Sequence, residues 1–137
     1  MTTKYDTEMI QIMALFERVT KSKLKDCFYY RERLTFVTEP GELKKALGKN
    51  NVNVEKLEKL TAKKVKIAEF STDKLTFIRN VLYPLRVVSM EEEEEVVVIK
   101  GPDAKTKGLM IGAKAKNLRR LEEVVQKYFP LKEIKVM

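Results

Sequence analysis

The sequence LGKNNVNVEKL at residues 47–57 has a counterpart 64 residues later, IGAKAKNLRRL at residues 111–121. Gly, Asn and Leu recur at identical spacing, and the apolar positions of the two copies match. In each copy a glycine separates a short apolar segment from a longer segment of helical periodicity, which predicts a helix, a tight turn and a second helix. An internal repeat of this kind predicts one supersecondary unit built twice.

The sequences around the two copies repeat as well. Helical spacing of apolar residues predicts a helix over residues 7–19, with Thr7 as its N-cap, and another over residues 72–83, with Ser71 or Thr72 as its N-cap. The predicted strands lie at residues 25–30, 34–38 and 65–70 in the first half and at 85–90, 96–100 and 133–136 in the second. Each half therefore has the order helix, strand, strand, helix, turn, helix, strand.

This order predicts an α+β fold with two domains, residues 1–70 and residues 71–137. Segments of about 68 residues bury only about 60% of their unfolded surface when they fold alone. Phe70 and Ser71 are not separated by a run rich in Gly, Pro or Ser. We therefore expect the two domains to pack against each other with almost no linker.

The composition narrows the range of functions. The 137 residues include 28 Lys and Arg against 20 Asp and Glu, a formal net charge of +8, which favours a polyanion such as nucleic acid as partner. The chain has no His and a single cysteine, Cys27, so we expect no catalytic site, metal site or disulfide. Without a signal-peptide pattern or a long apolar run, we expect a cytoplasmic protein that is not an enzyme and uses no cofactor.

The two glycine turns are candidate anion-binding sites. Amides in the first turn of a helix have no partner within the helix and lie at the positive end of its dipole. A phosphodiester approaches them closely only where the preceding turn lacks bulky side chains, which suits glycine.

A short helix, a glycine turn and a longer helix carrying Lys and Arg resemble the KH family, whose GXXG loop clamps a nucleotide backbone. The order of elements resembles the type II KH fold, and two such domains in so short a chain resemble the archaeal NusA-like transcription factors. The segments LFERVTKSKLKDC, ALGKNNVNVEKLEKL and KGLMIGAKAKNLRRLEEVVQKYF carry the resemblance, which covers essentially the whole chain. It implies a monomeric factor in transcription elongation or termination, with single-stranded nascent RNA and RNA polymerase as partners.

The resemblance also implies which residues bind RNA: Gly48, Lys49, Asn50, Asn51, Gly112, Ala113, Lys114, Ala115, Lys116, Arg119 and Arg120. Both loops lack the family's second glycine, because Asn51 and Ala115 stand in its place. Asn tolerates a left-handed backbone better than most residues, whereas Ala tolerates it poorly. We therefore expect the second turn to have rearranged or to extend the helix after it. The alternative function is a protein–protein adaptor on a KH scaffold whose loops have decayed.

Basic residues gather around the second turn, where only Asp103 opposes them: Lys100, Lys105, Lys107, Lys114, Lys116, Arg119 and Arg120. We interpret this segment as a patch that follows the phosphates of an RNA strand. The alternative is a solvated face whose charge is incidental. The first turn is less basic, so we expect the second domain to attract RNA more strongly.

Other residues are expected to be structural. The apolar residues of the repeat are predicted to be core: Leu47, Val54, Leu57, Ile111, Leu118 and Leu121. Leu47 and Ile111 are also candidates to line the groove that holds bases in KH domains. Asn53 and Asn117 are expected to hydrogen-bond local backbone.

Two unusual runs also receive structural interpretations. In residues 28–30, Phe28 and Tyr30 should share a buried strand face and Tyr29 the opposite one, while Cys27 should be a small buried hydrophobe. A stacking platform for a base is the alternative role of the aromatic residues. The glutamates at residues 91–95 are expected to form a solvated hairpin tip or an edge that repels RNA, because consecutive carboxylates on a strand alternate between faces.

Overall fold

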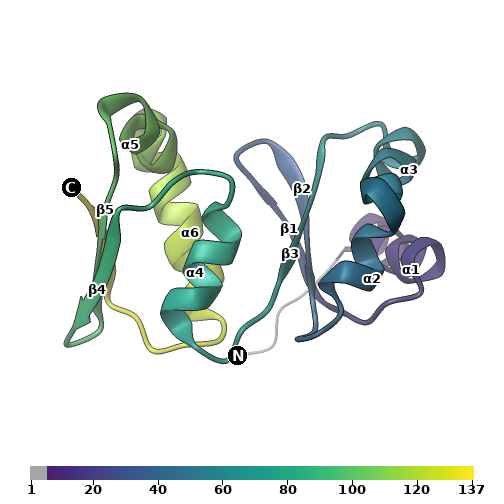
Figure 1. Ribbon diagram of the computed structural model, residues 1–137, viewed down its shortest axis with the longest axis horizontal. Helices are drawn as coiled ribbons and strands as arrows, with labels where there is room; N and C mark the ends of the chain where they lie inside the picture. The colour runs from purple at the N-terminus through teal and green to yellow at the C-terminus, as the bar shows by residue number, and fades with distance from the viewer. Residues whose placement is uncertain (1–5) are drawn as a thin grey trace. The chain divides into compact units, whose positions relative to one another are not determined.

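A computed structural model describes residues 6–137 of the chain. The contacts divide it into two compact units, with the division between Ser71 and Thr72. Each unit has one three-stranded sheet, and in each the helices lie on one face of that sheet (Figure 1).

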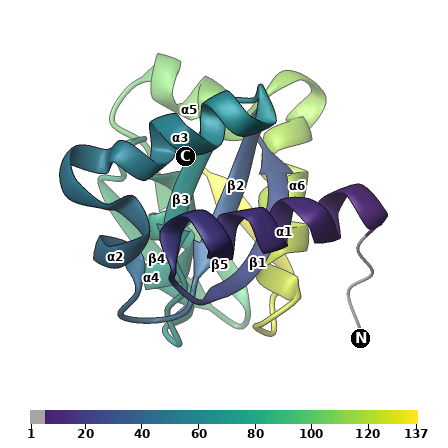
Figure 2. The same cartoon turned by 90° about the vertical axis from the view of Figure 1, so that its right-hand side faces the viewer.

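The first unit contains α1 (Thr7–Thr20), β1 (Leu24–Tyr30), β2 (Arg33–Thr38), α2 (Leu43–Leu47), a 3₁₀ turn (Lys49–Asn51), α3 (Val52–Thr61) and β3 (Val65–Glu69). β1 and β2 form an antiparallel hairpin, and β3 lies parallel to β2 on its other side, with Leu34 opposite Val65. The parallel pairing requires a crossover, which α2 and α3 supply. Figure 2 shows α1 and α3 side by side in front of this sheet.

The second unit contains α4 (Lys74–Leu82), β4 (Ser89–Glu93), β5 (Val96–Lys100), α5 (Ala104–Ile111), a 3₁₀ turn (Ala113–Ala115), α6 (Lys116–Gln126) and β6 (Glu133–Val136). Its sheet repeats the topology of the first, with β4 antiparallel and β6 parallel to the central β5. The predicted order of elements is confirmed in both halves, and the predicted strands at 96–100 and 133–136 are confirmed at both ends.

The predicted N-caps of the first helix in each unit were wrong. Asp6 caps α1 and accepts a hydrogen bond from Met9 N at 2.7 Å, and Asp73 caps α4 and accepts one from Thr76 N at 2.9 Å. A carboxylate both pairs with a first-turn amide and interacts favourably with the helix dipole, which explains why Asp takes this position from the neighbouring Ser and Thr residues.

The predicted strand at 85–90 was also misplaced. β4 begins at Ser89 and includes Glu91–Glu93, so the glutamate run does not lie wholly in the hairpin tip. The tip itself consists of Glu94 and Glu95, at φ 51° and 65°. Positive φ at both residues of a two-residue loop is the pattern of a type I′ turn, which matches the twist of the strands it connects.

The core of the first unit is apolar. Its buried residues are Ile12, Phe16, Cys27, Leu34, Phe36, Ala46, Leu57, Val65 and Ile67. Within it the Phe16 and Phe36 rings stack with their centroids 4.5 Å apart. Burial of Cys27 confirms its predicted role as a small hydrophobe.

Half of the core residues predicted from the repeat are fully buried. Leu57, Leu118 and Leu121 are buried; Leu47, Val54 and Ile111 are only half-buried. No helix among residues 6–137 is long and apolar enough to cross a membrane.

Candidate nucleic-acid interface

The first turn (Gly48–Asn51) and the second turn (Gly112–Ala115) have the same backbone geometry. Gly48 lies at φ 73°, ψ 180° and Gly112 at φ 75°, ψ 171°. This region of backbone space is accessible almost exclusively to glycine. Both glycines are therefore required by the backbone path between the two helices.

The two residues that end each turn also match. Asn50 and Lys114 lie at φ 55° and 54°; Asn51 lies at φ 58°, ψ 29° and Ala115 at φ 61°, ψ 24°. The expected rearrangement of the second turn was therefore wrong. Ala115 adopts the left-handed conformation in spite of a strain of about 1–2 kcal/mol.

A glycine–asparagine contact explains why the geometry persists. Asn53 donates through Nδ2 to Ala46 O at 2.9 Å, and Asn117 donates through Nδ2 to Leu109 O at 2.9 Å, so each side chain bridges the helices on either side of its turn. A Cβ on Gly48 would lie 2.9 Å from Asn53 Nδ2, and one on Gly112 would lie 2.7 Å from Asn117 Nδ2. The expected structural role of both asparagines is confirmed.

The turns present backbone and small side chains to solvent. Lys49, Asn50 and Asn51 are exposed in the first turn, and Ala113 and Lys114 in the second, while Gly48, Gly112 and Ala115 are half-buried. The N-cap residues of α3 and α6, Asn51 and Ala115, make no side-chain capping hydrogen bond. The amides at the start of both helices are thus not covered by a side-chain cap, which favours capture of an anion from solvent.

The lysines and arginines of the second turn differ in their surroundings. Lys114 and Lys116 are exposed, and within residues 6–137 neither takes part in an ion pair. Arg119 contacts Glu122 at 2.8 Å (Nη1 to Oε1), and Arg120 contacts Glu123 at 3.5 Å (Nη1 to Oε2). The prediction that Asp103 alone opposes the basic residues overlooked these pairs, because both carboxylates follow the segment that ends at Arg120.

Glu122 is a residue that the sequence reasoning missed. It is 7% exposed, and its Oε2 accepts a hydrogen bond from Ile134 N at 2.8 Å while its Oε1 holds Arg119. This hydrogen bond and the negative charge of Glu122 raise the pKa of Arg119. Arg119 is thus a fixed cation, with 59% of its side chain still exposed.

The first unit uses the equivalent glutamate in a simpler way. Glu58 lies 64 residues before Glu122, and its Oε2 accepts a hydrogen bond from Val65 N at 3.0 Å. The residue equivalent to Arg119 is Glu55, so the first unit has no arginine for Glu58 to hold. Matching glutamates in the two halves of the repeat were the sequence signal for this link between helix and strand.

The aromatic run is divided between faces as predicted. Phe28 and Tyr30 are 1% and 3% exposed, whereas Tyr29 is 41% exposed. The Lys63 ammonium lies 5.6 Å from the centre of the Tyr29 ring. Leu47 and Ile111 are half-buried immediately before the glycines, so each turn has an apolar residue beside it.

Metal chemistry finds no support in this arrangement. Among the described residues, no group of three or more His, Cys, Asp or Glu side chains is placed to hold a metal ion.

Comparison with known proteins identifies the family, although no family model matches the chain. A probable transcription termination protein NusA from Methanocaldococcus jannaschii is 31% identical over 134 residues, 96% of this chain and 73% of the relative. The chain belongs to the archaeal NusA family.

Other relatives agree with this assignment. Proteins of the same description from Thermoplasma acidophilum and Halobacterium salinarum are similar to this NusA-family chain over 96% and 99% of its length, at 25% and 28% identity. They are themselves covered to 93% and 99%. A solved structure titled "Crystal structure of APE1850" matches 97% of this chain and 100% of its own with a TM-score of 0.69 at 24% identity. That likeness shows a shared fold.

Proposed function

We propose that this NusA-family chain is a transcription elongation or termination factor that binds single-stranded RNA through two tandem type II KH domains, which are its two units. Each unit has the α-β-β-α-α-β order and the mixed sheet that this assignment requires. The relatives are described as probable transcription termination proteins, which supports a role in transcription. The implied partners are the nascent transcript and RNA polymerase.

The observation that carries the proposal is the shared geometry of the two turns. Two segments with different residues at three of their four positions take up the same glycine-led path, with exposed residues and an uncapped helix start behind them. A phosphodiester approaching such a turn meets backbone amides and the positive end of a helix dipole. The activity is therefore capture of the RNA backbone rather than catalysis.

Side chains around the turns add charge and a surface for bases. Lys49 serves the first turn, and Lys114 and Lys116 serve the second, where all three lysines are exposed. Arg119 and Arg120 keep further guanidinium donors for phosphate beyond those given to their glutamates. The apolar residues before the glycines line a groove for about four nucleotides, the number that a KH loop clamps.

The test compares two pairs of exposed lysines. Lys114→Ala with Lys116→Ala should weaken binding of a labelled random single-stranded RNA, measured by fluorescence anisotropy, far more than Lys56→Ala with Lys59→Ala. Each lost phosphate contact lowers the slope of log K against log salt by roughly 0.7, so the first pair should flatten it by about 1.4. All four lysines are exposed, so both double variants should melt like the unaltered protein.

Equal losses from the two pairs would show that the second turn has no special part in binding. Absence of RNA binding by the unaltered protein at low salt would favour the adaptor function instead, because the turns would then be structural remnants.

A further inference from the structure

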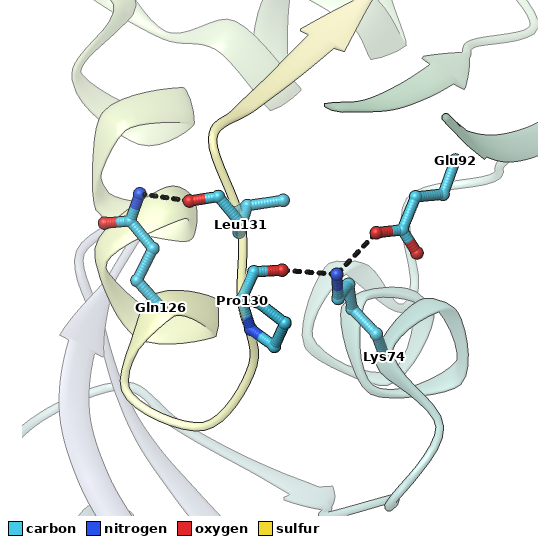
Figure 3. Close-up of polar contacts among 5 residues, drawn as sticks. All are labelled: Lys74, Glu92, Gln126, Pro130 and Leu131. Atoms are coloured by element: carbon cyan, nitrogen blue, oxygen red, sulfur yellow. Dashed lines mark hydrogen bonds and ion pairs between the residues drawn. The ribbon is translucent and has the colours of Figure 1, made fainter. Parts of the chain in front are cut away.

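The glutamate strand β4 divides its carboxylates between the two faces of the second sheet. Lys74, near the start of α4, contacts Glu92 Oε2 at 2.5 Å through Nζ and also donates to Pro130 O (Figure 3). Gln126 in α6 donates to Leu131 O in the same connection at 3.1 Å. Glu92 therefore points toward the helices. Since successive side chains on a strand alternate, Glu91 and Glu93 point to the opposite face.

That opposite face contains a shallow hollow with a volume of about 390 Å³. The residues that line it are Glu91, Glu92, Glu93, Glu94, Val96, Val98, Lys132 and Lys135. Val96 is opposite Glu93 and Val98 is opposite Glu91 in the β4–β5 ladder. The two valines are half-buried, so the hollow has an apolar floor with carboxylates along its β4 side.

β4 is also the terminal strand of its sheet. Val88 N donates to Lys100 O at 2.8 Å, which sets the phase of the antiparallel ladder. By alternation, the N–H and C=O groups of Ser89, Glu91 and Glu93 point away from β5, toward the edge. The same residues that present side chains to the hollow thus present backbone groups for pairing with a further strand.

The hollow lies at the end of the second unit remote from its glycine turn. Val96 at the hairpin pairs with Glu133, and β6 is reached from the C-terminal end of α6. The N-terminal end of α6, which carries the turn, is 11 residues away, or about 16 Å along the helix. Figure 1 likewise shows α5 and the β4–β5 hairpin at opposite ends of this sheet. The carboxylates therefore do not neutralise Lys114 and Lys116.

We propose that the β4 edge and the adjoining hollow dock an extended, basic segment of a partner protein, which adds to the sheet as a fourth strand. Lys or Arg at every second position of that segment lies beside Ser89, Glu91 and Glu93 on the outer face. Their aliphatic stems cover Val96 and Val98, because long cationic side chains bury their stems while keeping the charge solvated. Main-chain pairing supplies affinity and the charge pattern supplies selectivity.

Charge decides against the other occupants of this surface. A second copy pairing through β4 brings glutamates opposite glutamates, which is destabilising on a sheet. RNA phosphates meet the same repulsion. The proposal goes beyond RNA binding at the turns, and it concerns a separate surface.

The test uses a defined probe, an acetylated and amidated peptide of about eight residues in which Lys and Val alternate. It should bind the full chain at low salt, measured by fluorescence anisotropy. Glu91→Gln with Glu93→Gln should weaken binding about tenfold, as expected for loss of two exposed ion pairs. The matched control is Glu55→Gln with Glu123→Gln, which removes the same charge from exposed positions on α3 and α6. Peptide methylated on alternate backbone nitrogens should bind more weakly than the parent, because it cannot complete the ladder.

Amide exchange measured by NMR provides a second readout. Bound peptide should slow exchange of the Ser89, Glu91 and Glu93 amides, which an electrostatic attraction alone would leave unchanged. Equal weakening by both glutamine pairs, or unchanged exchange at these amides, would overturn the proposal. RNA binding should be preserved in Glu91→Gln with Glu93→Gln, so failure of the peptide experiment leaves the RNA proposal standing, and the reverse also holds.

Discussion

Replacing Gly112 by alanine tests the inference that a glycine–asparagine contact determines the path of the second turn. Gly112 lies at φ 75°, ψ 171°, and a Cβ there would lie 2.7 Å from both Cγ and Nδ2 of Asn117 and 3.0 Å from its backbone N. The backbone nitrogen is part of α6 and has little room to move. Alanine must therefore distort the turn or displace the Asn117 side chain.

The expected cost follows from two effects. A non-glycine residue in this region of backbone space costs about 1–3 kcal/mol. Displacing Asn117 removes its 2.9 Å hydrogen bond to Leu109 O, which contributes about 1 kcal/mol. We therefore expect Gly112→Ala to lower the free energy of unfolding by about 2–4 kcal/mol.

The chain offers a matched control four residues earlier. Gly108 lies within α5, and a Cβ there would have no neighbouring heavy atom within 4 Å. Gly108→Ala should raise stability by about 0.5–1 kcal/mol, because alanine loses less conformational entropy than glycine in a helix. The same substitution thus has opposite signs at the two positions.

Urea unfolding followed by circular dichroism measures both variants, and RNA anisotropy at fixed salt reports whether the altered turn still captures RNA. A Gly112→Ala protein whose unfolding free energy lies within about 0.5 kcal/mol of the unaltered one, the range of neutral surface changes, would refute the reasoning. Equal destabilisation by Gly108→Ala would refute it too, since α5 rather than the turn would then be responsible.

Three further substitutions follow from the structure. Ala115→Gly relieves left-handed strain of about 1–2 kcal/mol and adds unfolded-chain entropy of about 0.4–1 kcal/mol, so urea unfolding should show a small gain, larger than for Asn51→Gly, and RNA anisotropy a tighter complex. Burial and neighbouring arginines lower the pKa of Lys66 from 10.5 to about 7; the folded state therefore binds fewer protons than the unfolded state between these values, stability should rise with pH from about 7 to 10.5, and Lys66→Met should flatten that rise in thermal melts. Lys74→Met breaks the contact with Glu92 and should cost about 1–3 kcal/mol, most of it absent when Glu92→Gln is already present in a double-mutant cycle.

Much of the fold follows from the repeat, because apolar periodicity and the position of glycine are properties of local sequence. The placement of β4 failed for a physical reason. Glutamate has a low strand propensity, so Glu91–Glu93 looked like a connection, whereas pairing with Val96–Val98 and the contact of Glu92 with Lys74 hold them in the sheet. Tertiary partners overrode local preference.

The site shows a similar division between local and long-range information. The positions of both turns were predictable from sequence, but the left-handed conformation of Ala115 was not, since alanine alone disfavours it. The tether between Arg119 and Glu122 depends on Ile134 N, which fixes the glutamate from another element. A charge count along the chain counts Arg119 as a solvated cation and does not detect that link.

The two turns show how one geometry tolerates two chemistries. Their shared residues are the glycine at the start and the asparagine five positions later, at 48 and 53 in one turn and at 112 and 117 in the other. These residues determine the path, through backbone conformation and a hydrogen bond that spans the turn. The intervening side chains point into solvent and are free to change in charge. A chain that keeps this pair can therefore alter its attraction for a phosphate backbone at either turn without altering the cradle that holds it.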